Sequence, residues 1–183
     1  SYATAENGHD VVAIGAYAKS SNVKTITIGA YSSASGVQSI VIANNYNSDN
    51  SDVSDKSTAT GARAIVMGAE SHATAERALA IGDKNTVASA RTYAMGNNIN
   101  VAAGADDSLA FGTKAAVGAA NTVASGANAN AAQANSVALG AGSVTSAPHT
   151  GDYTLNNSYT AAGLPNAANG AVSVGSKDKE RQI

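Results

Sequence analysis

The chain has 183 residues, with one Phe, no Trp, no Cys, abundant Ala and a formal net charge of −2. This composition excludes a core of large interdigitating side chains, disulfide bonds and cysteine-ligated metal sites. The weak acidity argues against a general nucleic-acid binder, and no apolar run reaches the roughly 18 residues that cross a bilayer. The first residues, "SYATAENG", lack signal-peptide features. We expect either a cytosolic protein or a piece of a longer exported chain.

A repeat of 14 residues runs along the chain, marked by a short apolar stretch that closes on a small residue, here called the anchor. The anchors are Gly15, Gly29, Ala43, Gly68, Gly82, Gly96, Gly112, Gly126, Gly140 and Gly175. The successive intervals are 14, 14, 25, 14, 14, 16, 14, 14 and 35 residues. A constant period with occasional insertions is typical of a stacked repeat architecture.

Each repeat contains two alternating segments. The outer two of the three residues before each anchor are apolar, as in Ile26 and Ile28, which is the period of a β-strand. After the anchor, the third and fifth positions are small or aliphatic and the second and fourth are mostly polar, which predicts a second strand with its small face inward. We therefore predict an all-β fold, a parallel β-roll (solenoid) of 14-residue coils with two strands of about five residues each, in which Gly forms tight corners. Period two and recurrent Gly oppose the alternative of an Ala-rich helical protein.

The middle residue of each apolar stretch is predicted to point away from the interior. These residues are Ala13, Thr27, Val41, Val66, Ala80, Ala94, Ala110, Ser125, Ala138 and Ser173, and none is charged. A strand with two small or apolar faces needs cover on both. Because so thin a roll would barely offset the entropy of ordering its backbone, we expect cyclic association of identical copies. Composition does not distinguish three subunits from two.

Insertions lengthen three of the repeats. Residues 46–56 form a polar run that is predicted to bulge from a bend, and two further residues fall near "AAGADD". The spacing of Asp49, Asp52 and Asp55 raises the possibility of calcium binding, but the Gly and Glu of a calcium loop are missing. Residues 147–171 hold both Pro residues, and "YTLNNSYT" predicts a hairpin that turns at Asn156 and Asn157. This segment is either a structural flap over the end of the roll or a binding element.

With these repeats established, the chain resembles the YadA-like head domain of trimeric autotransporter adhesins. The motif "NSVALGAGS" at 135–143 is closest to the consensus of the family's repeated coil, which is also called a rung. Val172 to Gly175 and Glu180 to Ile183 resemble the neck of the family. Lys177 to Lys179 stand where Gly is commoner in the family, so the conformation of the bend that links these two parts is not predicted. The resemblance implies head repeats over 1–146, a head insert over 147–171, and the last rung with the start of the neck over 172–183. It also implies a left-handed roll, a homotrimer, and location at the surface of a Gram-negative bacterium through a C-terminal outer-membrane anchor absent here.

No enzymatic pattern is present. His9, His72 and His149 are scattered, no nucleophile-elbow or phosphate-loop motif occurs, and we expect no catalytic residue, metal or cofactor. The hexapeptide-repeat acyltransferases are the enzymatic alternative, but their coils need 18 residues. We expect a non-enzymatic adhesin head that binds host matrix proteins such as collagen, fibronectin or laminin, or sulfated glycans, through multivalent contacts. We expect no nucleic-acid partner and no membrane insertion by this fragment. The alternative is an architectural spacer that holds another binding tip away from the cell.

Two sets of residues are candidate ligand contacts. When the inserted residues are left out of the count, the ninth position after each anchor reads Lys24, Gln38, Arg63, Arg77, Arg91, Asp107, Asn121 and Asn135. Three stacked Arg require neutralisation, either by Glu70, Glu76 or a partner chain's carboxylates, or by an anionic ligand such as a sulfated glycan or acidic matrix protein. Tyr17 and Tyr31 either mark a protein-contact patch or cover Ala-rich surface. The predicted binding residues are therefore Arg63, Arg77, Arg91, Lys24, Tyr17 and Tyr31.

Overall fold

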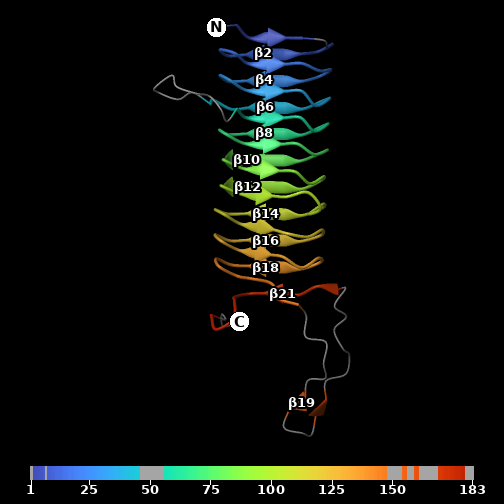
Figure 1. The fold of residues 1–183 in the computed structure, drawn as a ribbon, viewed down its shortest axis with the longest axis vertical. Coiled ribbons are helices and arrows are strands. Elements are labelled where there is room, and N and C mark those ends of the chain that lie inside the picture. The colour runs from blue at the N-terminus through green and yellow to red at the C-terminus, as the bar shows by residue number, and fades with distance from the viewer. Residues whose placement is uncertain are drawn as a thin grey trace.

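The computed structural model describes residues 2–6, 8–45, 56–147, 154–155, 159–160 and 169–179. Throughout these residues the repeating elements are β-strands, stacked coil upon coil into one long roll (Figure 1). Each coil contributes one strand to each of two facing sheets, and every strand in the stack runs parallel to its neighbours. The all-β parallel roll predicted from the repeat is therefore confirmed.

The first sheet has ten strands and is built from the apolar stretches before the anchors. Its register follows the repeat through every insertion, since Ala80 pairs with Ala94, Ala94 with Ala110, and Val41 with Val66. The strands are β2 (Val12–Ile14), β4 (Ile26–Ile28), β6 (Ile40–Ile42), β8 (Ile65–Met67), β10 (Leu79–Asp83), β12 (Tyr93–Asn97), β14 (Leu109–Phe111), β16 (Val123–Ser125), β18 (Val137–Leu139) and β21 (Val172–Ser173).

The second sheet is built from the segments after the anchors and is interrupted once. Seven strands pair continuously, and two more pair with each other beyond the two-residue insertion. The strands are β1 (Thr4–Ala5), β3 (Lys19–Ser20), β5 (Ser33–Ala34), β7 (Thr58–Ala59), β9 (His72–Ala73), β11 (Thr86–Val87), β13 (Asn100–Val101), β15 (Ala116–Val117) and β17 (Asn130–Ala131). Most strands have only two or three residues, fewer than the five predicted, because the two bends take up most of each coil.

Glycine anchors are required both by backbone conformation and by space. Gly82 has a φ of 114°, which side chains rarely adopt, and a Cβ atom added to it would lie 1.8 Å from the carbonyl oxygen of Gly96 in the next coil. The predicted role of the anchors at tight corners is confirmed here. Two anchors are not among the residues with positive φ: Ala43, the one anchor that is not Gly, and Gly175.

The direction of the apolar stretches was predicted wrongly. The middle residues face the interior, and Val41, Val66, Ala80, Ala94, Ala110 and Ala138 are fully buried within the single chain. In the apolar stretch before Gly126, the inward residue is Ala124 and not the predicted Ser125, because Ala124 is the residue that pairs with Ala110 and Ala138. The outer two residues, which are mostly larger, face outward; Ile14 is 57% exposed and Phe111 53%.

The reversal has a steric cause. A 14-residue coil brings its two sheets so close that the space between them holds Ala, Ser, Thr, Asn or Val, and Ile99 is the largest fully buried side chain among the described residues. An alternating strand specifies that two faces differ but not which face is inside, and the usual assignment of large apolar residues to the interior fails in so narrow a roll. The prediction for the second strand, with small residues such as Ala34 and Ala73 inward, is confirmed.

Polar side chains inside the roll satisfy the backbone at the bends. Ser57 Oγ donates to Asn45 Oδ1 at 2.7 Å, and Asn45 Oδ1 also accepts the backbone N–H of Glu70 at 2.9 Å. Further along, Asn85 Nδ2 donates to the carbonyl of Gly96 at 2.8 Å. Buried polar atoms of this kind need partners, which explains why Ser, Thr and Asn can occupy interior columns.

The strand pairing confirms the position that the repeat predicted for the 11-residue insertion. Thr58 pairs with Ser33, so the 11 extra residues fall between Asn45 and Ser57 as predicted. Asp49, Asp52 and Asp55 lie outside the described residues. The predicted hairpin is present as β19 (Thr154–Leu155) and β20 (Tyr159–Thr160), which pair antiparallel. Leu155 pairs with Tyr159, and the predicted turn at Asn156 and Asn157, between these two residues, lies outside the described residues.

Candidate binding surfaces

The outward side of the ten-stranded sheet is a long apolar surface, here called the apolar face. It consists of the outer two residues of each apolar stretch, arranged in two columns by the parallel register. Its most exposed members include Ile14, Ile28, Ile42, Met67, Tyr93, Phe111, Leu139 and Val172. Apolar patches that continue over many elements are uncommon on soluble monomers and mark interaction sites.

The bends place two further columns of side chains along the roll, and both have left-handed backbone. One contains Tyr17, Tyr31, Glu70, Lys84, Asn98, Lys114 and Asn128, with φ between 51° and 57°; the other contains Lys24, Gln38, Arg63, Arg77, Arg91, Asp107, Asn121 and Asn135, with φ between 53° and 60°. All eight ninth-position residues named from the sequence are therefore brought into one column. Sequence reasoning missed this conformation, although the recurrent Asn near the C-terminal end is a signal for it, because Asn tolerates positive φ.

The first two Arg of this column share one carboxylate. Glu76 accepts an ion pair from Arg63 at 3.2 Å and from Arg77 at 3.3 Å, and Arg63 Nε also donates to Gln38 Oε1 at 3.1 Å. The expected neutralisation by Glu76 is confirmed. Glu70 instead pairs with Lys84 at 3.5 Å.

Arg91 has its own partner in the next coil. Its Nε and Nη2 atoms donate to the two carboxylate oxygens of Asp107 at 2.5 and 2.7 Å, a bidentate geometry that fits the planar guanidinium. These hydrogen bonds raise the pKa of Arg91 and lower the pKa of Asp107. All three Arg thus have an acidic partner within the chain, and their binding of an external anion remains a prediction.

The two tyrosines of the first bend column stack on each other. The ring centroids of Tyr17 and Tyr31 are 4.9 Å apart and their planes differ by 22°. Tyr17 is still 53% exposed, and it lines a groove of about 320 Å³. The groove is also lined by Tyr2, Thr4, Lys19, Ser32, Ser33 and Lys56. The predicted stacking is confirmed, whereas the predicted role in protein contact is not tested by it.

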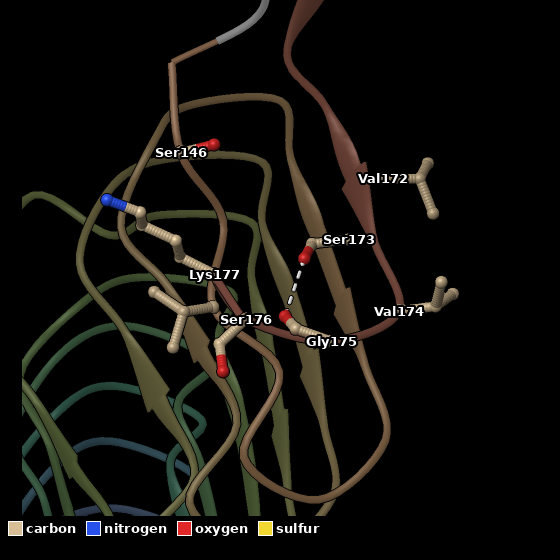
Figure 2. Close-up of a pocket in the computed structure, with 8 residues that line it drawn as sticks. Ser146, Val172, Ser173, Val174, Gly175, Ser176 and Lys177 are labelled. Carbon is tan, nitrogen blue, oxygen red and sulfur yellow. Dashed lines mark hydrogen bonds between the residues drawn. The ribbon is translucent and has the colours of Figure 1, made fainter. Parts of the chain in front are cut away.

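A larger hollow of about 680 Å³ lies at the C-terminal end of the roll, where the chain returns to the last coil (Figure 2). It is lined by Val144, Ser146 and residues 172–177. The N–H of Val144 donates to the carbonyl of Gly175 at 2.8 Å, and Ser173 Oγ donates to the same carbonyl at 2.8 Å. Figure 2 shows Val172 and Val174 on the opposite side of the strand from Lys177. Its lining consists of three Val, three Ser, one Gly and one Lys.

The two described His residues, His9 and His72, lie in different coils. His72 Nδ1 is 2.9 Å from Thr58 Oγ1, His9 lies at a bend near the N-terminal end, and His149 is outside the described residues. Among the described residues, no three His, Cys, Asp or Glu side chains are grouped so that they could hold a metal ion. The same part of the chain has no helix of the length and apolarity needed to span a membrane.

Comparison with known families identifies the repeat. The model of the YadA head domain repeat (2 copies) matches residues 59–89, 103–127 and 118–143. No curated protein matches the chain. The matched coils share their register and their glycine corners with the coils on either side, so the same unit continues beyond the matched residues. Residues 59–89 and 103–143 of the chain are therefore YadA head domain repeats, and the roll that they form with the coils on either side is YadA-like.

Proposed function

We propose that this chain is the non-enzymatic head of a bacterial surface adhesin, which works as a homotrimer and binds extracellular host ligands. The observation that carries the proposal is the apolar face, because ten parallel strands expose large aliphatic and aromatic side chains along one side of a roll of the YadA head type. At about 25 cal/mol per Å² of buried apolar area, covering this face stabilises a roll whose own interior is made of small residues.

Two further copies of the chain are the proposed cover. Cyclic symmetry about an axis parallel to the roll brings the three equivalent apolar faces together. Because every copy has the same spacing between coils, each coil of one subunit lies at the level of the same coil in the other two. This arrangement leaves the second sheet and its polar side chains facing outward. Anchoring in the outer membrane of a Gram-negative bacterium, through a C-terminal domain outside this chain, follows as part of the same proposal.

Host matrix proteins such as collagen, fibronectin or laminin are the proposed ligands. Each coil offers only a few small contacts, but identical coils recur along the roll and on three subunits, so many weak contacts act together. Lys24, Arg63, Arg77 and Arg91 are proposed contacts for acidic matrix proteins or sulfated glycans. An anion that binds the Arg column must compete with Glu76 and Asp107, which predicts weak and strongly salt-dependent binding.

Sedimentation of the fragment together with solid-phase binding to collagen, fibronectin and laminin tests the proposal. A trimer that binds at least one of these proteins supports it, and a stable monomer that binds none overturns it. Replacing Arg63, Arg77 and Arg91 by Gln should abolish retention on heparin at low salt without loss of the trimer. Unchanged retention would remove the Arg column from the binding surface.

An architectural spacer is the second candidate function. The unbroken stack of parallel coils favours it, because such a stack forms a stiff rod whether or not its surface binds anything. The two functions separate in the same assay, since a spacer forms the trimer but binds no matrix protein.

A further inference from the structure

The N-terminal groove beside Tyr17 combines aromatic and cationic side chains on one wall of the roll. Tyr2 and Tyr17 line it, Lys19 and Lys56 provide two ammonium groups, and Thr4 and Ser33 add hydroxyls. Thr4, Lys19 and Ser33 stand at equivalent positions of β1, β3 and β5, one above another in register. The groove therefore lies on the second sheet, which the proposed trimer leaves open.

The ring of Tyr17 is held in place but remains accessible to a ligand. Tyr31 stacks on it, and Tyr17 as a residue is still 53% exposed. An aromatic face is electron-rich and attracts polarised C–H groups such as those on a sugar ring. A rigid, partly stacked ring that is already ordered loses little entropy when a ligand packs on it.

Tyr17 and Tyr31 are the two aromatic residues of their left-handed bend column in the described chain. The positive φ of Tyr17 is shared by Glu70, Lys84 and Lys114, so this conformation belongs to the coil and not to a ligand site. The stacked aromatic pair is what distinguishes the N-terminal end of this column.

The two lysines differ in their electrostatic surroundings. Lys19 forms an ion pair with Glu6 at 3.4 Å, whereas Lys56 is exposed and makes no ion pair with any described residue. An incoming carboxylate or sulfate therefore meets an unpaired ammonium at Lys56, without displacing an acidic side chain of the described chain. This contrasts with the Arg column, where each guanidinium is already paired.

We propose that this groove binds one terminal acidic sugar of a host glycan. The sugar ring packs against the exposed part of Tyr17, its anionic group pairs with Lys56, and its hydroxyls bond to Ser33 and Thr4, all of which line the groove. A volume of about 320 Å³ lies at the small end of ligand sites, which fits a single sugar residue and excludes a longer chain from full enclosure. The inference rests on the proposed adhesin function, because a host-surface glycan is a ligand that only a surface head would meet.

Titration of the fragment with three oligosaccharides by calorimetry or ligand-observed NMR tests the proposal. 3′-Sialyllactose carries a carboxylate, 3′-sulfolactose carries a sulfate, and lactose carries neither. Either acidic sugar should bind at least tenfold more tightly than lactose, and the comparison of the two identifies which anion the groove prefers. Equal binding of lactose, or no binding of either acidic sugar, overturns the proposal.

Two substitutions place the binding in this groove. Tyr17→Asn removes the ring but keeps a residue that suits positive φ, and Lys56→Gln removes only the charge. Each should weaken binding of the preferred acidic sugar at least tenfold. The matched control is Lys114→Asn, in the same left-handed column far along the roll, which should leave binding unchanged. Unchanged affinity in both groove variants overturns the assignment, whatever their stability.

Sedimentation and matrix-protein binding of the same samples separate this inference from the proposed function. A trimer that binds matrix proteins but no acidic sugar contradicts the inference alone. A monomer that binds neither contradicts both.

Discussion

The two broad outer faces of the roll have the same strand spacing but opposite surface chemistry. The ten-stranded sheet exposes Ile, Leu, Met, Phe and Tyr, whereas the second sheet exposes Lys, Ser, Thr, His and Asn in register, among them Lys19, Ser33, Thr58 and His72. Inside the roll the two sheets present similarly small side chains. The difference between the faces therefore does not arise from how the single chain packs.

This contrast shows that, in a narrow solenoid, one set of residues specifies the fold of the chain and another set is available for association with other molecules. Small inward residues and glycine corners are enough to specify the coil, and alternation leaves every outward position free to vary. One set of outward positions is apolar and suits burial between copies, and the other is polar and suits ligands. The predictions below test whether the two faces have these separate roles.

The largest expected effect is on assembly. Ile42 and Met67 pair in register on the apolar face, and each is about two-fifths exposed in the single chain. Replacing both by Asp should convert the trimer to a monomer in sedimentation, with the β-sheet circular dichroism retained, because charge cannot be buried between copies without a partner. Thr60→Asp with Thr74→Asp, on the second face, is the matched control and should remain trimeric. A trimer that survives the Asp pair on the apolar face would refute its proposed role.

The next effect concerns the inward residues. Ala94 is fully buried between Ala80 and Ala110, so Ala94→Leu should destabilise the fold by about 1–3 kcal/mol through overpacking. The adjacent Met95 faces outward, and Met95→Leu should change stability much less. Urea unfolding at a fixed protein concentration measures both, since oligomer stability depends on concentration. Equal tolerance of the two substitutions would contradict the observed facing of the strand.

A smaller and opposite effect is expected at the left-handed bends. Lys114 has a φ of 56°, and Asn128 occupies the equivalent position one coil later. Lys114→Asn should therefore stabilise the protein by up to about 1 kcal/mol, because Asn tolerates this conformation better. Thermal unfolding of this variant beside Lys114→Ala provides the control, since Ala relieves no strain. A gain for Ala equal to that for Asn would show that removal of the lysine, and not conformation, is responsible.

The smallest expected effect is the pH dependence of the Arg91 and Asp107 pair. Since the hydrogen bonds from Arg91 lower the pKa of Asp107, the folded state binds this proton less tightly than the unfolded state. The pair therefore stabilises the fold fully above about pH 4, the ordinary Asp range, and the contribution is lost as pH falls through the lowered pKa. Asp107→Asn, which keeps a residue suited to positive φ, should lower the unfolding temperature slightly at pH 7 and not at acid pH. A difference independent of pH would contradict this.

Much of the architecture could be predicted because the repeat is visible in single residues. The intervals between anchors predicted the register through each insertion, including the pairing of Val41 with Val66 across 25 residues. The stacking of Tyr17 on Tyr31 and the pairing of Glu76 with Arg77 followed from the same columns. The positive φ of Lys, Arg and Tyr at the bends could not be predicted, because these residues have no intrinsic preference for it.

By itself, the amino-acid sequence determined the period, the strand type, the glycine corners and the columns in which side chains meet, because all of these depend on spacing along the chain. Only the tertiary structure decided which side of each strand faces inward, because that depends on the distance between the two sheets and not on alternation. The same distance admits Ala80 and excludes the larger residues beside it, so the bulky side chains form an outer surface instead of a core.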